Sequence, residues 1–170
     1  MREHRGEGFV YSSLWIVFGL QALLIWIISL PVQLGIYYAV DDWHALHVMG
    51  LVLWVTGFLF ETVSDYQLAS FLTKRKTGEE VMDKGLWRFT RHPNYFGDFL
   101  VWWGFFFISL AGVATQVWWT VIGPVIMSIL LMRVSGVTLL EQSLLKSRPA
   151  YADYCRRTNS FFPWFPRRAF

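Results

Sequence analysis

The stretch that decides the fold is a polar segment that runs directly into a long apolar one. It reads GLWRFTRHPNYFGD at residues 85–98 and continues as FLVWWGFFFISLAGVATQVWWTVIGPVIMSILLM at residues 99–132. Arginine, histidine, asparagine, tyrosine and aspartate crowd together where the apolar run begins. Ionisable groups at membrane depth are costly and by default indicate a functional site. We therefore expect residues 85–98 to form the mouth of a site at the start of a membrane helix.

The apolar run is too long for one membrane span. Residues 99–132 contain no Asp, Glu, Lys or Arg, and as one helix they would measure about 51 Å. The hydrocarbon core of a bilayer is only about 30 Å thick. We predict that the run folds back on itself, with its turn at residues 111–116. Two further uncharged stretches, residues 8–40 and 43–60, each suffice for a span of roughly 20 residues.

These lengths predict an all-α fold, a polytopic membrane helical bundle of about four transmembrane helices that forms one domain over residues 1–170. Pro31 is expected to end the first span, because proline cannot continue the helical hydrogen-bond ladder. The predicted spans are residues 12–30, 44–64, 95–111 and 117–137, joined by a cytoplasmic loop at 65–94 and followed by a cytoplasmic tail at 138–170.

The positions of the positive charges predict the orientation. All fifteen Lys and Arg residues lie in the N-terminal arm, in the loop at 65–94, or from Arg133 onward. Four spans with both termini in the cytoplasm place every cation on one side, as the positive-inside rule requires. The net charge of +3 therefore reflects topology, and no nucleic-acid-reading motif accompanies it. We expect a multi-pass integral membrane protein, of the inner membrane in a bacterium or the endoplasmic reticulum in a eukaryote.

Two kinds of site are disfavoured by the sequence. His44 and His47 have no third ligand near them, so no metal site is expected. No glycine-rich dinucleotide loop is present, so any nucleotide would bind by a non-Rossmann route.

The strongest candidate site is the segment His92-Pro93-Asn94-Tyr95. Proline is favoured at the first helical position, which would make His92 the N-cap residue. The free N–H groups of such a helix start can bind an anion or a carbonyl. Asn94 and Asp98 are four residues apart and share a helix face, with Tyr95 beside them. The alternative is an interfacial helix start at which Arg91 and His92 reach toward lipid headgroups.

Two other groups extend this site. Glu61 and Asp65 lie four residues apart at the inner end of the second span, where they could hold ribose hydroxyls or pair with Arg88 or Arg91. The cationic run at residues 74–76 could bind a cofactor phosphate, or serve topology and lipid headgroups. The aromatic residues at 161–166 suit an interfacial anchor or a plug over the site.

The motifs carry a family resemblance. GLW at 85–87 followed by RHPNYFGD at 91–98 resembles the C-terminal domain of the steroid 5-alpha-reductase-like family, and more narrowly its bacterial branch of unknown function. SGV at 135–137, LLE at 139–141, YADY at 151–154 and FPW at 162–164 fit the same branch. NYFGD at 94–98 and YCRR at 154–157 also look like membrane sterol reductases. Essentially the whole chain is covered.

The resemblance implies a membrane-embedded, NADPH-dependent oxidoreductase that reduces a carbon–carbon double bond in a steroid-like or other lipid substrate. NADPH would bind on the cytoplasmic side. By resemblance, the residues that would line the cofactor pocket are Asp65, Tyr66, Arg91, Asn94, Asp98, Glu141 and Tyr154.

Hydride transfer to an activated alkene needs an acid that stabilises the developing enolate oxygen. Tyr95 and His92 are the catalytic candidates that the sequence offers. The expected partners are the lipid substrate, which would enter from the bilayer, and the membrane lipids. Nucleic acid is not expected, and the oligomeric state is left open.

Two alternatives remain at this stage. The Arg-His-Pro-x-Tyr-x-Gly pattern is shared with membrane methyltransferases of the isoprenylcysteine and phospholipid type. In that case Arg91, His92, Tyr95 and Glu141 would hold S-adenosylmethionine. The second alternative is a truncated, non-catalytic family member. Reductases of this type usually carry several further spans before the point where Met1 falls, and REHRG at residues 2–6 resembles the middle of a longer chain.

Overall fold

A computed structural model describes residues 14–39, 41–111, 113–134, 141, 144–145 and 149–167. These residues form helices and connecting turns and contain no strand, so the predicted all-α class is confirmed. In chain order the elements are η3 Leu14–Phe18, α2 Gly19–Ile28, α3 Leu30–Tyr37, α4 Ala45–Lys74, η4 Gly85–Arg88, α5 Pro93–Leu110, α6 Ala114–Val117, η5 Trp118–Val121, α7 Ile122–Ile129, η6 Leu130–Val134 and α9 Pro149–Arg157.

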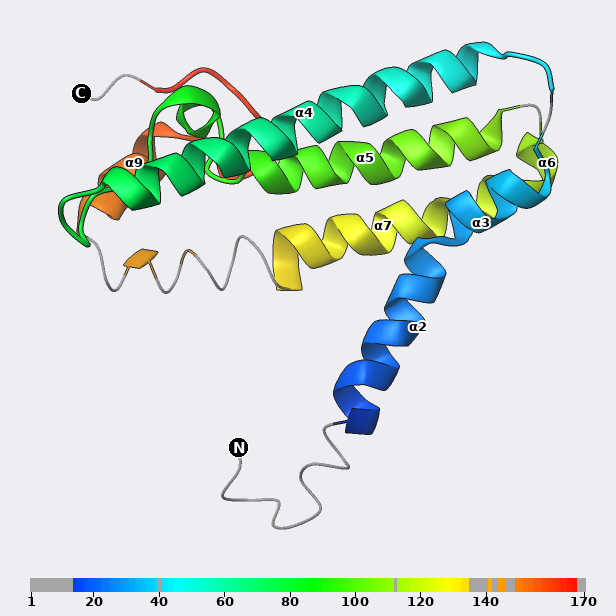
Figure 1. Cartoon of the computed structure of the whole chain (residues 1–170), viewed down its shortest axis with the longest axis horizontal. Helices are drawn as coiled ribbons and strands as arrows, with labels where there is room; N and C mark the ends of the chain where they lie inside the picture. Colours follow the sequence, from blue (N-terminus) through cyan, green and yellow to red (C-terminus); the bar gives the residue numbers. More distant parts are fainter. Residues whose placement is uncertain are drawn as a thin grey trace.

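The centre of the molecule is an antiparallel pair of long helices, α4 and α5 (Figure 1). Helix α7 lies along the other side of α5, and α3 packs on α5 near the end where α5 finishes. Helix α9 and the end of the chain lie at the opposite end, where α4 finishes and α5 begins. Helix α2 projects away from the bundle.

Small residues let α4 and α5 approach closely. A Cβ added to Gly57 would lie 2.5 Å from the carbonyl oxygen of Gly97, and one added to Gly50 would lie 2.7 Å from that of Gly104. Each helix places its two glycines seven residues apart, which keeps them on one face of the helix. Interfaces between membrane helices favour such residues, because they allow backbone contact. This close contact brings the C-terminal part of α4 against the first turns of α5.

Two helices, Ala45–Lys74 and Ala114–Arg133, are long and apolar enough to cross a membrane. The bent pair Trp15–Ile28 and Leu30–Tyr37 would provide a third span. Helix α5 has 18 residues, and its polar first turns lower its mean hydropathy. The chain is therefore a membrane protein by its apolar helices, while the four-span count and the cytoplasmic orientation of the termini remain predictions.

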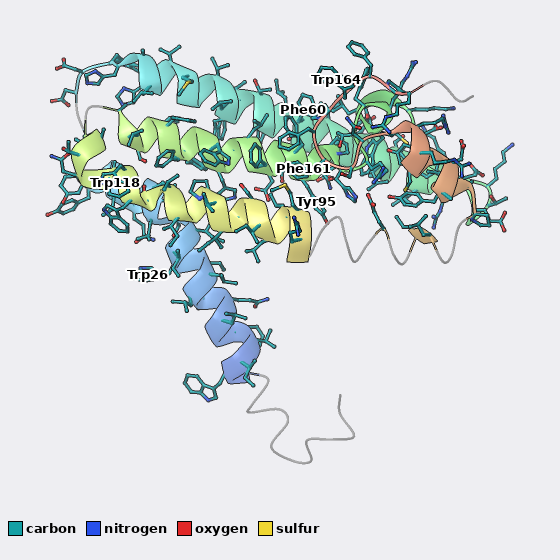
Figure 2. The ribbon with its side chains drawn as sticks, turned by 180° about the vertical axis from the view of Figure 1, so that it is seen from behind. Trp26, Phe60, Tyr95, Trp118, Phe161 and Trp164 are labelled. Atoms are coloured by element: carbon teal, nitrogen blue, oxygen red, sulfur yellow. The ribbon has the colours of Figure 1, made fainter. Side chains whose placement is uncertain are left out.

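The surface of the bundle is strongly apolar, as expected for a protein in lipid. Figure 2 shows Trp26 on the projecting α2 and Trp118 at the end of the bundle away from Phe161 and Trp164. The side chains of Trp26, Trp118 and Trp164 are all largely exposed. Tryptophans at both ends of a bundle are typical of membrane–water interfaces.

The first helix ends just before Pro31, near the predicted boundary, but the structure adds a second helix that the sequence did not predict. Helix α2 stops at Ile28, and α3 begins at Leu30 with Pro31 in its first turn, after a bend of 46°. Proline is well tolerated in a first helical turn, where its missing N–H has no partner to lose. Pro31 therefore starts a second helix that continues to Tyr37.

The other predicted boundaries agree more closely with the structure. Helix α4 continues past the predicted span as far as Lys74. The chain reverses between the end of α5 at Leu110 and the start of α6 at Ala114. The end of the fourth predicted span and the start of the tail, residues 135–140, fall outside the described residues.

Candidate functional site

The loop between α4 and α5 is fixed to α4 by side-chain hydrogen bonds. Gly85 starts η4 with a φ of 61°, a left-handed conformation that favours glycine. The Leu86 N–H then donates to Gln67 Oε1 at 3.0 Å. One residue further, the buried Trp87 donates its indole N–H to the Ser64 carbonyl at 3.0 Å. These contacts set the position from which α5 begins.

The tail of the chain holds the same loop from the other side. The Arg91 N–H donates to the Asn159 carbonyl at 2.9 Å, and the Trp164 N–H donates to the Phe89 carbonyl at 2.9 Å. Thr90 is fully buried and donates its hydroxyl proton to the Phe161 carbonyl at 2.8 Å. The loop and the tail are therefore joined by both backbone and side-chain hydrogen bonds.

The aromatic tail has an inner and an outer side. The Phe161 side chain is buried, and its ring lies 6.1 Å from that of Phe96 and 5.7 Å from that of Phe99 on α5. Phe162, Trp164 and Phe165 are exposed instead. Phe161 thus covers the start of α5, while the exposed rings suit an interfacial anchor.

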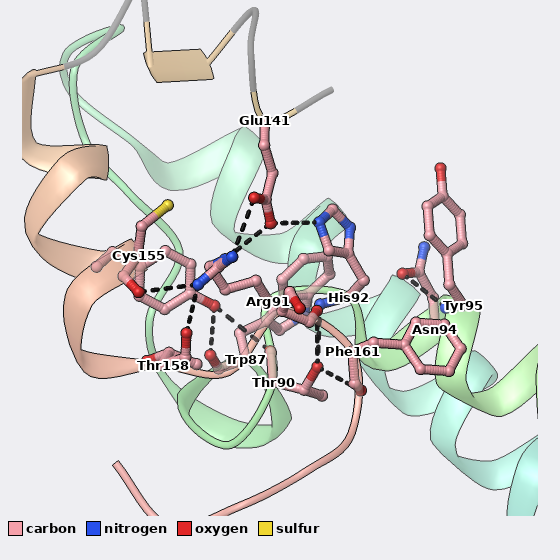
Figure 3. A network of polar contacts seen from close by, with 12 residues as sticks. Trp87, Thr90, Arg91, His92, Asn94, Tyr95, Glu141, Cys155, Thr158 and Phe161 are labelled. Carbon is pink, nitrogen blue, oxygen red and sulfur yellow. Dashed lines mark hydrogen bonds and ion pairs between the residues drawn. The ribbon is translucent and has the colours of Figure 1, made fainter. Parts of the chain in front are cut away.

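Arg91, Glu141 and His92 form one polar network (Figure 3). The Arg91 guanidinium donates to both Glu141 oxygens, from Nε at 2.8 Å and from Nη2 at 3.0 Å. Arg91 Nη1 donates to the carbonyls of Cys155, at 2.9 Å, and Thr158. His92 Nε2 lies 3.1 Å from Glu141 Oε1. Bidentate pairing of this kind fixes geometry as well as charge.

The charges of this network stabilise one another. Burial works against ionisation of Glu141, but hydrogen bonds from His92 and Arg91 outweigh it and hold the carboxyl pKa below its ordinary value. Burial opposes the charged form of Arg91 too, yet the Glu141 carboxylate raises the guanidinium pKa. Glu141 is therefore ionised at neutral pH and accepts from both of its neighbours.

Tyr154 stabilises the loop that carries Arg91 and His92. Its side chain is buried, and its hydroxyl donates to the Trp87 carbonyl. Burial raises the pKa of Tyr154, and the neighbouring Tyr151 adds to the effect. The structure thus places Tyr154 beneath the loop, as a support for the segment that carries Arg91 and His92.

A second polar group lies at the seam between α4 and α5. We name Glu61, Asp65, Asn94 and Asp98 the mouth cluster. Asn94 Nδ2 donates to Asp65 Oδ1 at 3.0 Å, and Asn94 Oδ1 accepts from the Tyr95 N–H at 3.0 Å. Glu61 lies close enough to Asp98 and Asp65 for their charges to interact. The structure thus brings together residues that the sequence placed on two separate helices.

The two catalytic candidates lie between these groups. The rings of His92 and Tyr95 are stacked, with centroids 5.4 Å apart and planes at 4°. The His92 side chain is only 3% exposed, whereas Tyr95 is half-buried. Figure 3 shows the Tyr95 ring pointing away from the tail. Tyr95 is therefore the one of the pair that a ligand at the mouth cluster can reach.

A cavity of about 200 Å³ opens beside His92, and neither Tyr95 nor a residue of the mouth cluster is among its described lining residues. Leu68 and Leu72 of α4 line one wall, and Arg91, His92 and Tyr151 line the other. Tyr66 does not belong to it. Its side chain is 74% exposed and borders a separate cavity with Gln67, Ser70 and Lys74. Successive residues of a helix point about 100° apart, which separates Tyr66 from the neighbouring Asp65.

Some contacts at the site were not predicted from the sequence. Arg91 pairs with Glu141 and not with Glu61 or Asp65, and Thr90 and Trp87 act as buried supports. No sequence motif indicates that Thr90 would be a buried support. The acceptors at Cys155 and Thr158 are backbone carbonyls, which any residue could supply, so their positions could not be predicted either. No group of three or more His, Cys, Asp and Glu side chains able to hold a metal ion occurs in the part of the chain that the structure describes.

The comparisons with known proteins assign the family. A family model described as "Protein of unknown function (DUF1295)" matches residues 1–158. The chain belongs to this family. The match thus covers all of the helices that the structure describes and the site residues as far as Thr158, but not Asn159, Phe161 and Trp164 of the tail. No solved structure gives a significant match to the chain.

Curated relatives of this DUF1295 chain carry a functional name. The "3-oxo-5-alpha-steroid 4-dehydrogenase 1" of Mus musculus is 31% identical over 75 residues, which are 43% of this chain and 29% of the mouse protein. The human protein of the same name is 33% identical over 67 residues, 38% of this chain and 26% of its own length. The bovine one is 33% identical over 85 residues, 48% and 32% respectively. The chain therefore spans less than a third of these relatives in each match.

These relatives support the resemblance to the steroid 5-alpha-reductase-like family.

Proposed function

We propose that this protein is a membrane-embedded reductase that uses NADPH to reduce a carbon–carbon double bond in a steroid-like or other lipid substrate. The observation that carries the proposal is the mouth cluster, in which Asn94 and Asp65 are hydrogen-bonded across two helices beside the stacked His92 and Tyr95. The names of the curated relatives support the same reaction class.

The chemistry of the mouth cluster fits the hydroxyl-rich part of such a cofactor. Ribose hydroxyls donate hydrogen bonds, and ionised carboxylates accept them. Asp65 and Glu61 offer such oxygens on α4, and Asn94 adds an amide that both donates and accepts. Phosphates fit poorly here, because the nearest cation, Arg91, already pairs with Glu141.

A phosphate fits better at the far end of α4. Arg75 follows the last residue of α4, and its buried Nη1 has no hydrogen-bond partner among the described residues. Arg75 shares a cavity of about 260 Å³ with Lys74 and Lys84. Glu61, Asp65, Leu68 and Leu72 follow the helical spacing of one face that leads toward Arg75. The cofactor would lie along this face of α4, with its ribose at the mouth cluster and a phosphate at Arg75.

Bound NADPH would supply the hydride. When hydride adds to the β-carbon of an enone, negative charge develops on the carbonyl oxygen, and a positioned acid stabilises it. Tyr95 is the proposed donor, because its half-buried ring lies at the mouth. His92 is a positioning residue in this proposal, since its buried ring stacks on Tyr95 and is held by Glu141.

Ligand-dependent stabilisation in detergent tests the proposal. A ligand that binds only the native state stabilises it by about 2.7 kcal/mol at a hundredfold excess over Kd. We expect NADPH to raise the unfolding temperature of the native chain, and Asn94→Ala and Asp98→Ala each to remove that shift. Asp153→Ala, at an exposed carboxylate on α9, is the matched control and should keep it.

Three results would contradict the proposal. An NADPH shift that persists in both mouth variants would refute the site. Stabilisation by S-adenosylmethionine and not by NADPH would favour the methyltransferase alternative. The absence of a shift with either ligand would favour a non-catalytic family member.

A further inference from the structure

The site described above leaves a second polar cavity unexplained, on the other side of the loop. This cavity of about 540 Å³ is lined by Lys84, Arg88, Arg157 and Arg167, which we name the cationic cleft. Asp83 is the only carboxylate among its described lining residues. None of these four cations belongs to the mouth cluster, although Lys84 also lines the cavity of about 260 Å³ beside Arg75.

The cationic cleft is built from three segments, which one backbone and one side-chain hydrogen bond hold together. Lys84 precedes η4 and Arg88 ends it, Arg157 ends α9, and Arg167 lies in the tail. The Arg167 N–H donates to the Arg157 carbonyl at 2.9 Å, and the Thr158 hydroxyl donates to the Arg88 carbonyl at 3.5 Å. Cations that serve only to orient the protein in the membrane need not gather around one cavity, because the positive-inside rule depends on their number and on the side of the membrane where they lie.

The charge of the cleft is incompletely compensated. Arg157 pairs with Asp153 at 2.8 Å and lies 3.7 Å from Asp83. Lys84, Arg88 and Arg167 form no ion pair within the described ranges. Three unpaired cations around one concave space attract an anion with several acceptor oxygens, and arginine matches phosphate geometry in particular.

The surroundings of the cleft identify the source of that anion. Trp164 and Phe165, which precede Pro166 and Arg167, are largely exposed. Tryptophans of membrane proteins are enriched at the level of the lipid headgroups. The tail therefore holds Arg167 at the depth where phosphodiester groups lie, and clusters of Lys and Arg there recognise anionic lipids.

We propose that the cationic cleft binds the phosphodiester headgroup of an anionic membrane lipid. Bound lipid bridges η4, α9 and the tail, and so clamps the loop that carries Arg91 and His92. This inference goes beyond the proposed reductase activity and does not depend on it.

Lipid binding by the purified full chain in a non-ionic detergent tests the inference. Native mass spectrometry with added phosphatidylglycerol or phosphatidylcholine measures the two affinities. The wild type should bind phosphatidylglycerol preferentially. The double variant Arg88→Gln/Arg167→Gln should weaken phosphatidylglycerol binding about thirtyfold, from about 1 kcal/mol per surface cation. Arg88→Lys/Arg167→Lys should restore most of it.

The matched control removes two cations outside the cleft. Lys76→Gln/Arg156→Gln changes exposed side chains and should leave phosphatidylglycerol affinity within about twofold of the wild type. Equal weakening by both double variants would overturn the inference, as would equal affinity of the wild type for the two lipids. Displacement of the lipid by inorganic phosphate at similar concentration would assign the cleft to a soluble anion instead.

Measuring the stabilisation by NADPH on the same variants separates this inference from the reductase proposal. The cleft variant should keep the stabilisation by NADPH, while Asn94→Ala should keep the preference for phosphatidylglycerol. Loss of both ligands in the cleft variant would assign the cleft to a cofactor phosphate and overturn the lipid. The absence of NADPH stabilisation alone therefore rejects only the reductase proposal, and the absence of phosphatidylglycerol preference alone rejects only the lipid proposal.

Discussion

Glu141 receives two parallel N–H bonds from the guanidinium of Arg91, which lies 50 residues away along the chain, at 2.8 and 3.0 Å. The side chains are only 15% and 11% exposed. Removing one partner of a largely buried pair leaves an uncompensated charge, at a cost of about 3 kcal/mol. We therefore expect Glu141→Ala to lower the free energy of unfolding in detergent by about that amount.

The matched control for this substitution is Asp153→Ala. The ion pairs of Asp153 with Arg156 and Arg157 are far more exposed, and such pairs contribute about 0–1 kcal/mol. Equal losses of stability in the two variants would show that Arg91 and Glu141 do not act as a buried pair.

The same carboxyl predicts an acid dependence of stability. The pKa of Glu141 is lower in the folded chain than its ordinary value of 4.5. Its contribution is therefore fully present above pH 4.5 and is lost as the pH falls through the folded pKa. Unfolding measured from pH 6 to pH 3 should show a shallower acid slope for Glu141→Gln than for the wild type. Parallel curves would contradict the prediction.

The raised pKa of Tyr154 predicts that stability also depends on pH in the alkaline range. Its pKa is raised above 10 by burial, so the unfolded chain loses this proton first and stability falls as the pH rises above 10. Tyr154→Phe should make that alkaline slope shallower. It should also cost about 1–2 kcal/mol at neutral pH, because the Trp87 carbonyl loses its donor. Tyr37→Phe, at an exposed ring, is the control and should change neither quantity.

The seam between α4 and α5 predicts a sign difference between two glycine substitutions. In Gly57→Ala the new Cβ would lie 2.5 Å from the Gly97 carbonyl and 2.8 Å from the Leu100 side chain. Overpacking of this kind costs about 1–3 kcal/mol. Gly19 on α2 has no atom within 4 Å of such a Cβ, so Gly19→Ala should stabilise by up to about 1 kcal/mol. Thermal unfolding in detergent distinguishes the two, and the same sign in both would reject the close contact.

The proposal that Tyr95 is the acid predicts that its substitution slows turnover but leaves NADPH binding unchanged. Tyr95→Phe keeps the ring that stacks on His92 but removes the proton donor. General acids contribute at least about a hundredfold to rates, so NADPH oxidation with an enone lipid should slow by that factor or more. Stabilisation by NADPH should remain, and Tyr37→Phe, at an exposed ring outside the site, should behave as the wild type. Unchanged turnover in Tyr95→Phe would exclude this role.

The helical spacing and the proline rule predicted the parts of the fold that depend on local sequence. Pro93 starts α5, and His92 precedes it as the N-cap residue. The same rule predicted the helix end near Pro31 but not the helix that follows, because a proline that ends one helix and a proline that starts the next look alike in a sequence. The surrounding apolar residues suit both, and only packing in three dimensions decides between them.

The site was predicted in part for a similar reason. Spacing of four residues placed Asn94 with Asp98 and Glu61 with Asp65, each on one helix face. Which of these faces meets which depends on the glycine contacts between α4 and α5, and sequence spacing does not report them. The pairing of Arg91 with Glu141 joins segments 50 residues apart, so several carboxylates were equally plausible partners before the fold was known.

The hydrogen bonds between the loop and the tail set an order of assembly. During translation Phe89, Thr90 and Arg91 leave the ribosome well before Asn159, Phe161 and Trp164, the residues that bond to them. The helices α5 and α7 are synthesised in the interval between these two segments. The loop that presents Arg91 and His92 therefore reaches its final geometry only after the helical bundle has been synthesised, so maturation of the site is a late, post-insertion event.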